Sequence, residues 1–177
     1  MAINKGYLTA KTNKESDEYY TPKEAILPIL EYLPKDKQIT IWCPFDKEDS
    51  EYVKIFKANN FNVIFSHIDN NQNFFYYEPT APYDFIISNP PFSCKDDVLK
   101  RLYELNKSFA VLFPLPTLQG TKRFKYLKDT QVLIFDKRIN FFTKVENHKI
   151  EKKGVAFASI YICKDFLPEK LIFKELK

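Results

Sequence analysis

The chain has 177 residues, of which 45% are hydrophobic and 16% aromatic, so it can bury a core and is not intrinsically disordered. Its formal net charge of +4 permits a nucleic-acid partner without requiring one. No run of about 18 apolar residues marks a membrane span, and the polar start lacks the apolar centre of a signal peptide. We expect a flexible arm at residues 1–18 and one cytoplasmic domain at residues 19–177.

The cysteines indicate free thiols and no metal site. Cys43, Cys94 and Cys163 are odd in number and far apart, and they form no C-x-x-C pair. Only two histidines are present to complete a zinc site. A reducing compartment is therefore expected.

Hydrophobic periodicity predicts helices and strands that alternate along most of the chain. Thr21-Pro22-Lys23-Glu24 is typical of a helix start, with the Thr21 hydroxyl as the cap and proline at the first helical position. The predicted helices cover residues 21–33, 48–59, 95–106 and 117–128, and the predicted strands cover 39–43, 61–65, 83–88, 109–113, 132–135, 155–163 and 171–173. The polar residues 143–153 are expected to form a long loop or, alternatively, a solvated hairpin.

This alternation predicts an α/β fold with a mostly parallel sheet and helices on both faces. The late strands have little helix between them, which predicts an antiparallel edge. In such folds the ligand lies beyond the carboxyl ends of the strands, near the point where the strand order reverses. The loops at residues 43–48, 66–73 and 89–94 qualify by position.

The loop after the strand at 83–88 reads Asn89-Pro90-Pro91-Phe92. Two adjacent prolines remove two backbone donors, so a buried strand ends there. The Asn89 side-chain oxygen and the Pro90 carbonyl can each accept a hydrogen of an amino group, while Phe92 stacks on a flat ring. Holding both hydrogens out of the ring plane frees the nitrogen lone pair for an electrophile. Alternatively, the loop only turns the chain and Phe92 belongs to the core.

Ser88-Asn89-Pro90-Pro91-Phe92 resembles the catalytic motif of S-adenosylmethionine-dependent amino-methyltransferases, especially those that act on adenine in nucleic acid. The segments at 17–22, 109–116, 137–141 and 155–163 look like further parts of such enzymes, and the whole is similar to small phage-type adenine methyltransferases without a target-recognition domain. The resemblance implies a Rossmann-like fold with a seven-stranded sheet, S-adenosylmethionine as cofactor, and methyl transfer to the exocyclic amino group of adenine, in DNA rather than RNA.

The resemblance also implies residue roles. The catalytic residues would be Asn89, Pro90, Pro91 and Phe92, and the cofactor would contact Tyr20, Thr21, Pro22, Cys43, Pro44, Phe45, Asp46, His67, Asp69, Asn73 and Phe74. The turn after the first strand lacks the glycine that the family usually has there, so a ligand cannot readily approach its backbone. His67 could instead be a hydrogen-bonded surface residue, and Phe74 a core residue.

Lys122, Arg123 and Lys125 alternate with apolar residues on a predicted helix, so they form either a phosphate-contacting face or a solvated one. Two alternatives to the enzyme reading stay open. The missing glycine favours a catalytically silent methyltransferase-like module that binds nucleic acid or a protein partner, in phage counter-defence or as a subunit of a heteromeric enzyme. The second alternative is an enzyme that methylates a glutamine side chain of a protein, because enzymes of that kind can carry a similar loop.

Overall fold

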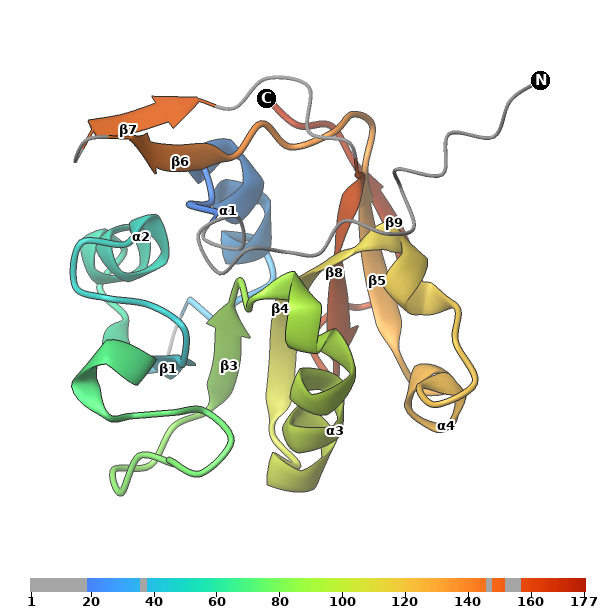
Figure 1. The fold of residues 1–177 in the computed structure, drawn as a ribbon, viewed down its shortest axis with the longest axis horizontal. Coiled ribbons are helices and arrows are strands. Elements are labelled where there is room, and N and C mark those ends of the chain that lie inside the picture. Colours follow the sequence, from blue (N-terminus) through green and yellow to red (C-terminus); the bar gives the residue numbers. More distant parts are fainter. Residues whose placement is uncertain (1–18, 36–37, 146–147, 152–156) are drawn as a thin grey trace.

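A seven-stranded sheet with the order β2-β1-β3-β4-β8-β5-β9 forms the centre of the protein (Figure 1). The computed structural model describes residues 19–35, 38–145, 148–151 and 157–177, so the predicted arm at 1–18 lies outside the described residues. The strands are β1 (Thr40–Cys43), β2 (Asn62–Phe65), β3 (Phe85–Ser88), β4 (Ser108–Pro114), β5 (Gln131–Phe135), β8 (Ser159–Lys164) and β9 (Leu171–Lys174). Strands β1 to β4 are parallel, and β8 runs antiparallel between β4 and β5. The mixed, mostly parallel sheet is confirmed.

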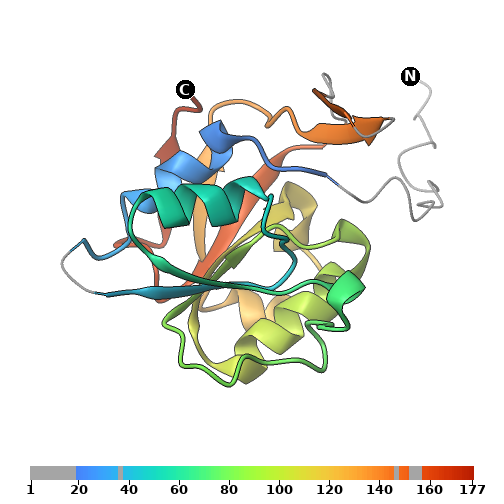
Figure 2. The same cartoon turned by 90° about the vertical axis from the view of Figure 1, so that its left-hand side faces the viewer.

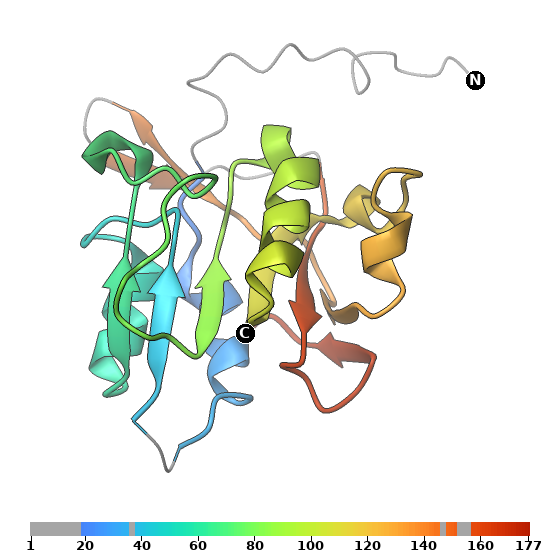
Figure 3. The same ribbon diagram turned by 90° about the horizontal axis from the view of Figure 1, so that it is seen from below.

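Helices cover both faces of this sheet, as predicted. Helices α1 (Lys23–Leu30) and α2 (Glu51–Ala58) lie on one face, and α3 (Lys95–Leu105) and α4 (Phe124–Leu127) lie on the other (Figures 2 and 3). Because side chains alternate along a strand, Ile41 and Cys43 of β1 pack in the α1/α2 core while Trp42 packs in the α3 core. Within the described ranges, no helix is both long and apolar enough to cross a bilayer.

The strand order reverses at β1. The chain leaves β1 through α2 to reach β2 on one side, and β3 pairs with the other side of β1. The loops that follow β1 and β3 therefore diverge at the carboxyl ends of the strands and leave room for a ligand between them.

Two helix predictions need correction. Helix α1 begins at Lys23 after Pro22, and Thr21 does not cap it, because the Thr21 hydroxyl is buried and bonds Tyr52 instead. The helix predicted at 117–128 is replaced by a 3₁₀ turn, η5 (Leu115–Leu118), and the four-residue α4. Arg123 explains the break, because its guanidinium donates hydrogen bonds to backbone carbonyls just upstream of it.

Residues 143–153 begin as a hairpin, not as a long loop. Strands β6 (Phe142–Val145) and β7 (His148–Glu151) pair antiparallel, and residues 152–153 lie outside the described residues. The hairpin lies beyond the carboxyl ends of the parallel strands, above α1 in Figure 1. Two backbone hydrogen bonds of 2.9 Å join Tyr20 and Phe142, so the hairpin is tied to the segment before α1.

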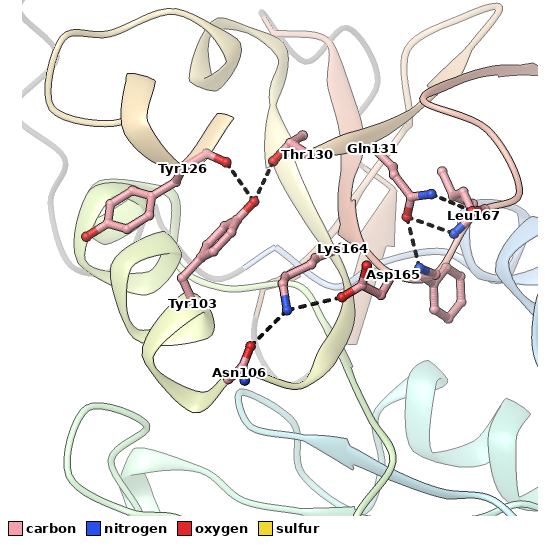
Figure 4. A network of polar contacts seen from close by, with 9 residues as sticks. Tyr103, Asn106, Tyr126, Thr130, Gln131, Lys164, Asp165 and Leu167 are labelled. Atoms are coloured by element: carbon pink, nitrogen blue, oxygen red, sulfur yellow. Dashed lines mark hydrogen bonds and ion pairs between the residues drawn. The ribbon is translucent and has the colours of Figure 1, made fainter. Parts of the chain in front are cut away.

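The opposite rim of the sheet is held by side-chain hydrogen bonds (Figure 4). The Gln131 oxygen accepts the backbone N–H groups of Phe166 (2.9 Å) and Leu167 (3.0 Å), and its nitrogen donates to the Leu167 carbonyl. The Tyr103 hydroxyl donates to the Tyr126 carbonyl at 2.7 Å, which fixes α4 against α3. These contacts stabilise the turns at the amino ends of the parallel strands.

Candidate active site

A partly open cavity of about 230 Å³ lies where the strand order reverses. We call it the switch-point cavity. Four segments line it: the residues before α1, the turn after β1, the loop after β2 and the proline loop after β3. Its lining residues are at positions 19–21, 44–47, 49–52, 67–68, 73–75, 89–92 and 94. All three loops that the fold prediction selected by position meet here.

The proline loop presents an oriented amide to this cavity. Asn89 Nδ2 donates to the backbone carbonyl of Tyr19 at 3.1 Å. Its other amide atom, Oδ1, is buried and has no hydrogen-bond partner among the described residues. A buried acceptor without a partner costs about 1–3 kcal/mol, so a hydrogen-bond donor brought to this oxygen would be favourable.

Phe92 belongs to both the core and the cavity. It packs against the α1/α2 core and also lines the cavity, so the two alternatives for this residue coexist. Its ring lies nearly parallel to Tyr19, with 6.2 Å between centroids and 21° between planes. Phe141 and Phe157 meet Phe92 edge-on, at 78° and 85°. Phe92 is therefore fixed in orientation by three rings.

The turn after β1 folds without glycine. No residue of the turn at 44–50, all of which is described, has a positive φ. Asp46 instead draws the turn inward, because its carboxylate accepts hydrogen bonds from the hydroxyls of Ser88 (2.5 Å) and Ser50. Ser50 is also the N-cap of α2 and accepts the Val53 N–H at 3.2 Å. One carboxylate thus joins the end of β1, the end of β3 and the start of α2.

Burial changes the proton affinity of this carboxylate. Asp46 is only 8% exposed, and desolvation raises its pKa from 3.8 to about 6, although the two serine hydrogen bonds act in the opposite direction. A cationic ligand group in the cavity would favour the ionised form. In the interior, the hydroxyls of Tyr52 and Tyr161 form a hydrogen bond of 2.7 Å.

The loop after β2 carries no acidic residue at the strand end. Ser66 is fully buried there and accepts the Trp42 Nε1 hydrogen at 2.9 Å, which holds β1 to β2. His67 lines the cavity, and its Nδ1 accepts the Asp69 N–H at 3.2 Å. Asp69 does not line the cavity and forms an exposed ion pair with Lys47 at 2.5 Å, and the hydrogen bond from Lys47 lowers its pKa.

Aromatic rings form the wall near Asn73. The Asn73 side-chain oxygen accepts the Phe75 N–H at 3.0 Å, which turns the loop toward the cavity. Phe74 is 2% exposed and lies 4.8 Å from the Phe45 ring and 5.6 Å from Trp42, between centroids. Phe74 is thus a core residue that also forms a wall.

The structure brings most of the predicted cofactor residues together. Those that line the cavity are Tyr20, Thr21, Pro44, Phe45, Asp46, His67, Asn73 and Phe74. Pro22, Cys43 and Asp69 do not line it: Pro22 caps α1, and the Cys43 side chain is fully buried in the sheet. Sequence reasoning assigned no role to Tyr19, Ser50, Glu51 or Phe75, although Tyr19 lies in the segment 17–22 that resembles part of such enzymes. The serine before Glu51 and an apolar helix was a recognisable N-cap.

The predicted basic face divides into two kinds of residue. Arg123 pairs with Asp96 and donates to the Thr117 carbonyl at 2.9 Å, and its side chain is only 12% exposed. Lys122 and Lys125 are exposed and stay candidates for phosphate contacts. Within the part of the chain that the structure describes, no three His, Cys, Asp or Glu side chains come together as a metal site.

No protein-family model and no curated protein sequence matches the chain. Precorrin-6y C5,15-methyltransferase from Geobacter metallireducens GS-15 aligns structurally over 84% of this chain and 93% of its own, with 17% identity and a TM-score of 0.44. A putative methyltransferase from Thermoplasma acidophilum aligns over 88% of this chain and 68% of its own, with 11% identity and a TM-score of 0.40. At this level of similarity neither protein assigns a function to the chain.

Proposed function

We propose that the protein is an S-adenosylmethionine-dependent methyltransferase that modifies the exocyclic amino group of adenine in nucleic acid, with DNA favoured over RNA. The observation that carries the proposal is the state of Asn89. One atom of its amide is bound by the Tyr19 carbonyl, and the other is a buried oxygen without a partner beside the cavity. Such an oxygen suits an amino group, which brings its own hydrogens.

The proline loop would act on this amino group by position. Asn89 Oδ1 and the Pro90 carbonyl would accept one hydrogen each, and the Phe92 ring would support the base. The amino lone pair would then point out of the ring plane. Orientation of this kind is worth about 7–11 kcal/mol in well-aligned systems, so no strong base is required of the loop.

The remaining walls of the cavity fit the cofactor. S-adenosylmethionine, when bound, supplies a methyl group on a sulfonium; transfer to the amino nitrogen would break the sulfur–methyl bond, release S-adenosylhomocysteine as a neutral thioether, and lose one amino proton to solvent. Phe45, Phe74 and Phe75 offer aromatic surface to a flat adenine ring. Asp46 and Glu51 offer carboxylates to an ammonium group or to ribose hydroxyls.

The Asn89→Ala variant tests the proposal. Because Asn89 would meet the base and not the cofactor, methyl transfer should fall at least about 100-fold, as when one oxyanion-type contact is removed. Binding of radiolabelled S-adenosylmethionine should stay within about threefold of wild type. Asn62→Ala, at an exposed amide on the edge strand β2, is the matched control. Transfer by Asn89→Ala at near the wild-type rate would rule out this role.

The silent-module alternative makes the opposite prediction for the wild type. It requires that the purified protein shows no saturable binding of radiolabelled S-adenosylmethionine. Because the turn after β1 needs no left-handed residue, the lack of glycine alone does not prevent this turn from forming. Absence of binding would contradict the proposed reaction.

A further inference from the structure

We infer that Tyr19 is a substrate-binding residue, and that its ring and the Phe92 ring form an aromatic clamp that receives the flat ring of the substrate between two faces. The inference rests on the proposed function, because the ring in the clamp is the base whose amino group meets Asn89. It adds a second wall, supplied by the segment before α1, to a site otherwise built from the proline loop.

The ring geometry is the first support. Tyr19 and Phe92 line the same cavity, and their planes are only 21° from parallel. Their centroids are 6.2 Å apart, as in an offset-stacked pair, so the two rings would have to part to receive a flat ring, which needs about 7 Å between the faces on either side of it.

The backbone of the same residue is the second support. The Tyr19 carbonyl accepts Asn89 Nδ2 at 3.1 Å and so leaves Oδ1 as the amide atom available to a ligand. Tyr19 therefore orients the acceptor with its main chain and offers a stacking face with its side chain. A flat ring that enters the clamp lies beside the oxygen that would accept its amino hydrogen.

The segment that carries Tyr19 is anchored from outside the proline loop. Tyr20 pairs with Phe142 of β6 through two backbone hydrogen bonds. The Tyr19 ring contacts Phe141 at 5.5 Å and Phe157 at 5.7 Å, between centroids. Phe141 and Phe157 also contact Phe92, so the two rings share these neighbours, whereas the Tyr20–Phe142 backbone bonds hold the Tyr19 segment from outside the proline loop.

The test is the kinetics of two side-chain variants of Tyr19. Stacking against one aromatic face is worth about 5- to 150-fold in base binding, so Tyr19→Leu should raise KM for an adenine-containing single strand about 10-fold or more. Its kcat should stay within about twofold, because the carbonyl that orients Asn89 is retained. Tyr19→Phe keeps the ring and should behave as wild type. Tyr76→Leu, at a tyrosine 89% exposed outside the cavity, is the matched control.

Direct binding separates this inference from the reaction itself. Fluorescence anisotropy of a labelled oligoadenylate, measured with S-adenosylhomocysteine present, should show about 10-fold weaker binding for Tyr19→Leu than for wild type. If wild type binds the strand and this difference appears without any methyl transfer, the clamp stands and the proposed reaction fails. Equal binding by the two proteins, no binding by wild type, or equal losses in kcat, cofactor affinity and thermal stability in Tyr19→Leu would each overturn the clamp.

Discussion

Asp46 is an acidic side chain placed in the interior at the turn after β1. Its pKa is raised to about 6 by burial, above the ordinary 3.8, so the folded protein binds this proton more tightly than the unfolded chain does. The resulting stabilisation is present at low pH, below the unfolded pKa, and it is lost as the pH rises through the folded pKa. The difference between the two pKa values corresponds to about 3 kcal/mol.

The Asp46→Asn variant should remove this pH dependence. We expect the free energy of unfolding of wild type, relative to that of the variant, to fall by about 3 kcal/mol between about pH 3 and pH 7. Urea denaturation of both proteins across this range measures the difference. Asp97→Asn, at an exposed carboxylate in the first turn of α3, should keep the wild-type slope. Parallel curves for wild type and Asp46→Asn would show that Asp46 is not buried as described.

Among the elements, one rim of the sheet carries the cavity and the other is held by side-chain hydrogen bonds. The amide of Gln131 at the start of β5 holds the turn between β8 and β9 by bonding both Phe166 and Leu167 (Figure 4). Neither these residues nor the Tyr103 network line the cavity. Changes at this rim should therefore affect folding without affecting ligand binding.

The Gln131→Leu variant tests this separation. It leaves two partly buried N–H groups and one carbonyl without their partner, so the free energy of unfolding should fall by about 2 kcal/mol. Cofactor binding at a temperature well below unfolding should be unchanged. Gln119→Leu, at an exposed glutamine, should alter neither quantity. A loss of cofactor affinity in folded Gln131→Leu would show that the two rims are coupled.

Elements with a strong apolar pattern could be predicted, and those set by single polar side chains could not. Strand β4 and helix α3 follow from continuous or helically spaced apolar residues. The helix expected at 117–128 fails because Arg123 binds carbonyls that a continuous helix would use, and nothing local indicates where an arginine will point. The β6–β7 hairpin has a polar sequence, and such a sequence is compatible with either a long loop or a solvated hairpin.

For the whole molecule, the position of the site follows from topology more than from motif. Sequence periodicity placed three loops at the carboxyl rim, and the reversal of strand order at β1 brings them together around one cavity. The proline loop was recognisable because two prolines end a buried strand. The approach of Tyr19 to Asn89, 70 positions apart, is a tertiary contact with no local signature.

We propose that this rim transfers a methyl group to the amino nitrogen of adenine. The most direct measurement is nucleoside mass spectrometry of single-stranded DNA, duplex DNA and RNA after incubation with purified wild-type protein and methyl-labelled S-adenosylmethionine. We expect labelled N6-methyladenine in DNA with wild type and none with Asn89→Ala. Protein that binds the labelled cofactor but leaves every adenine-containing polymer unlabelled would contradict it.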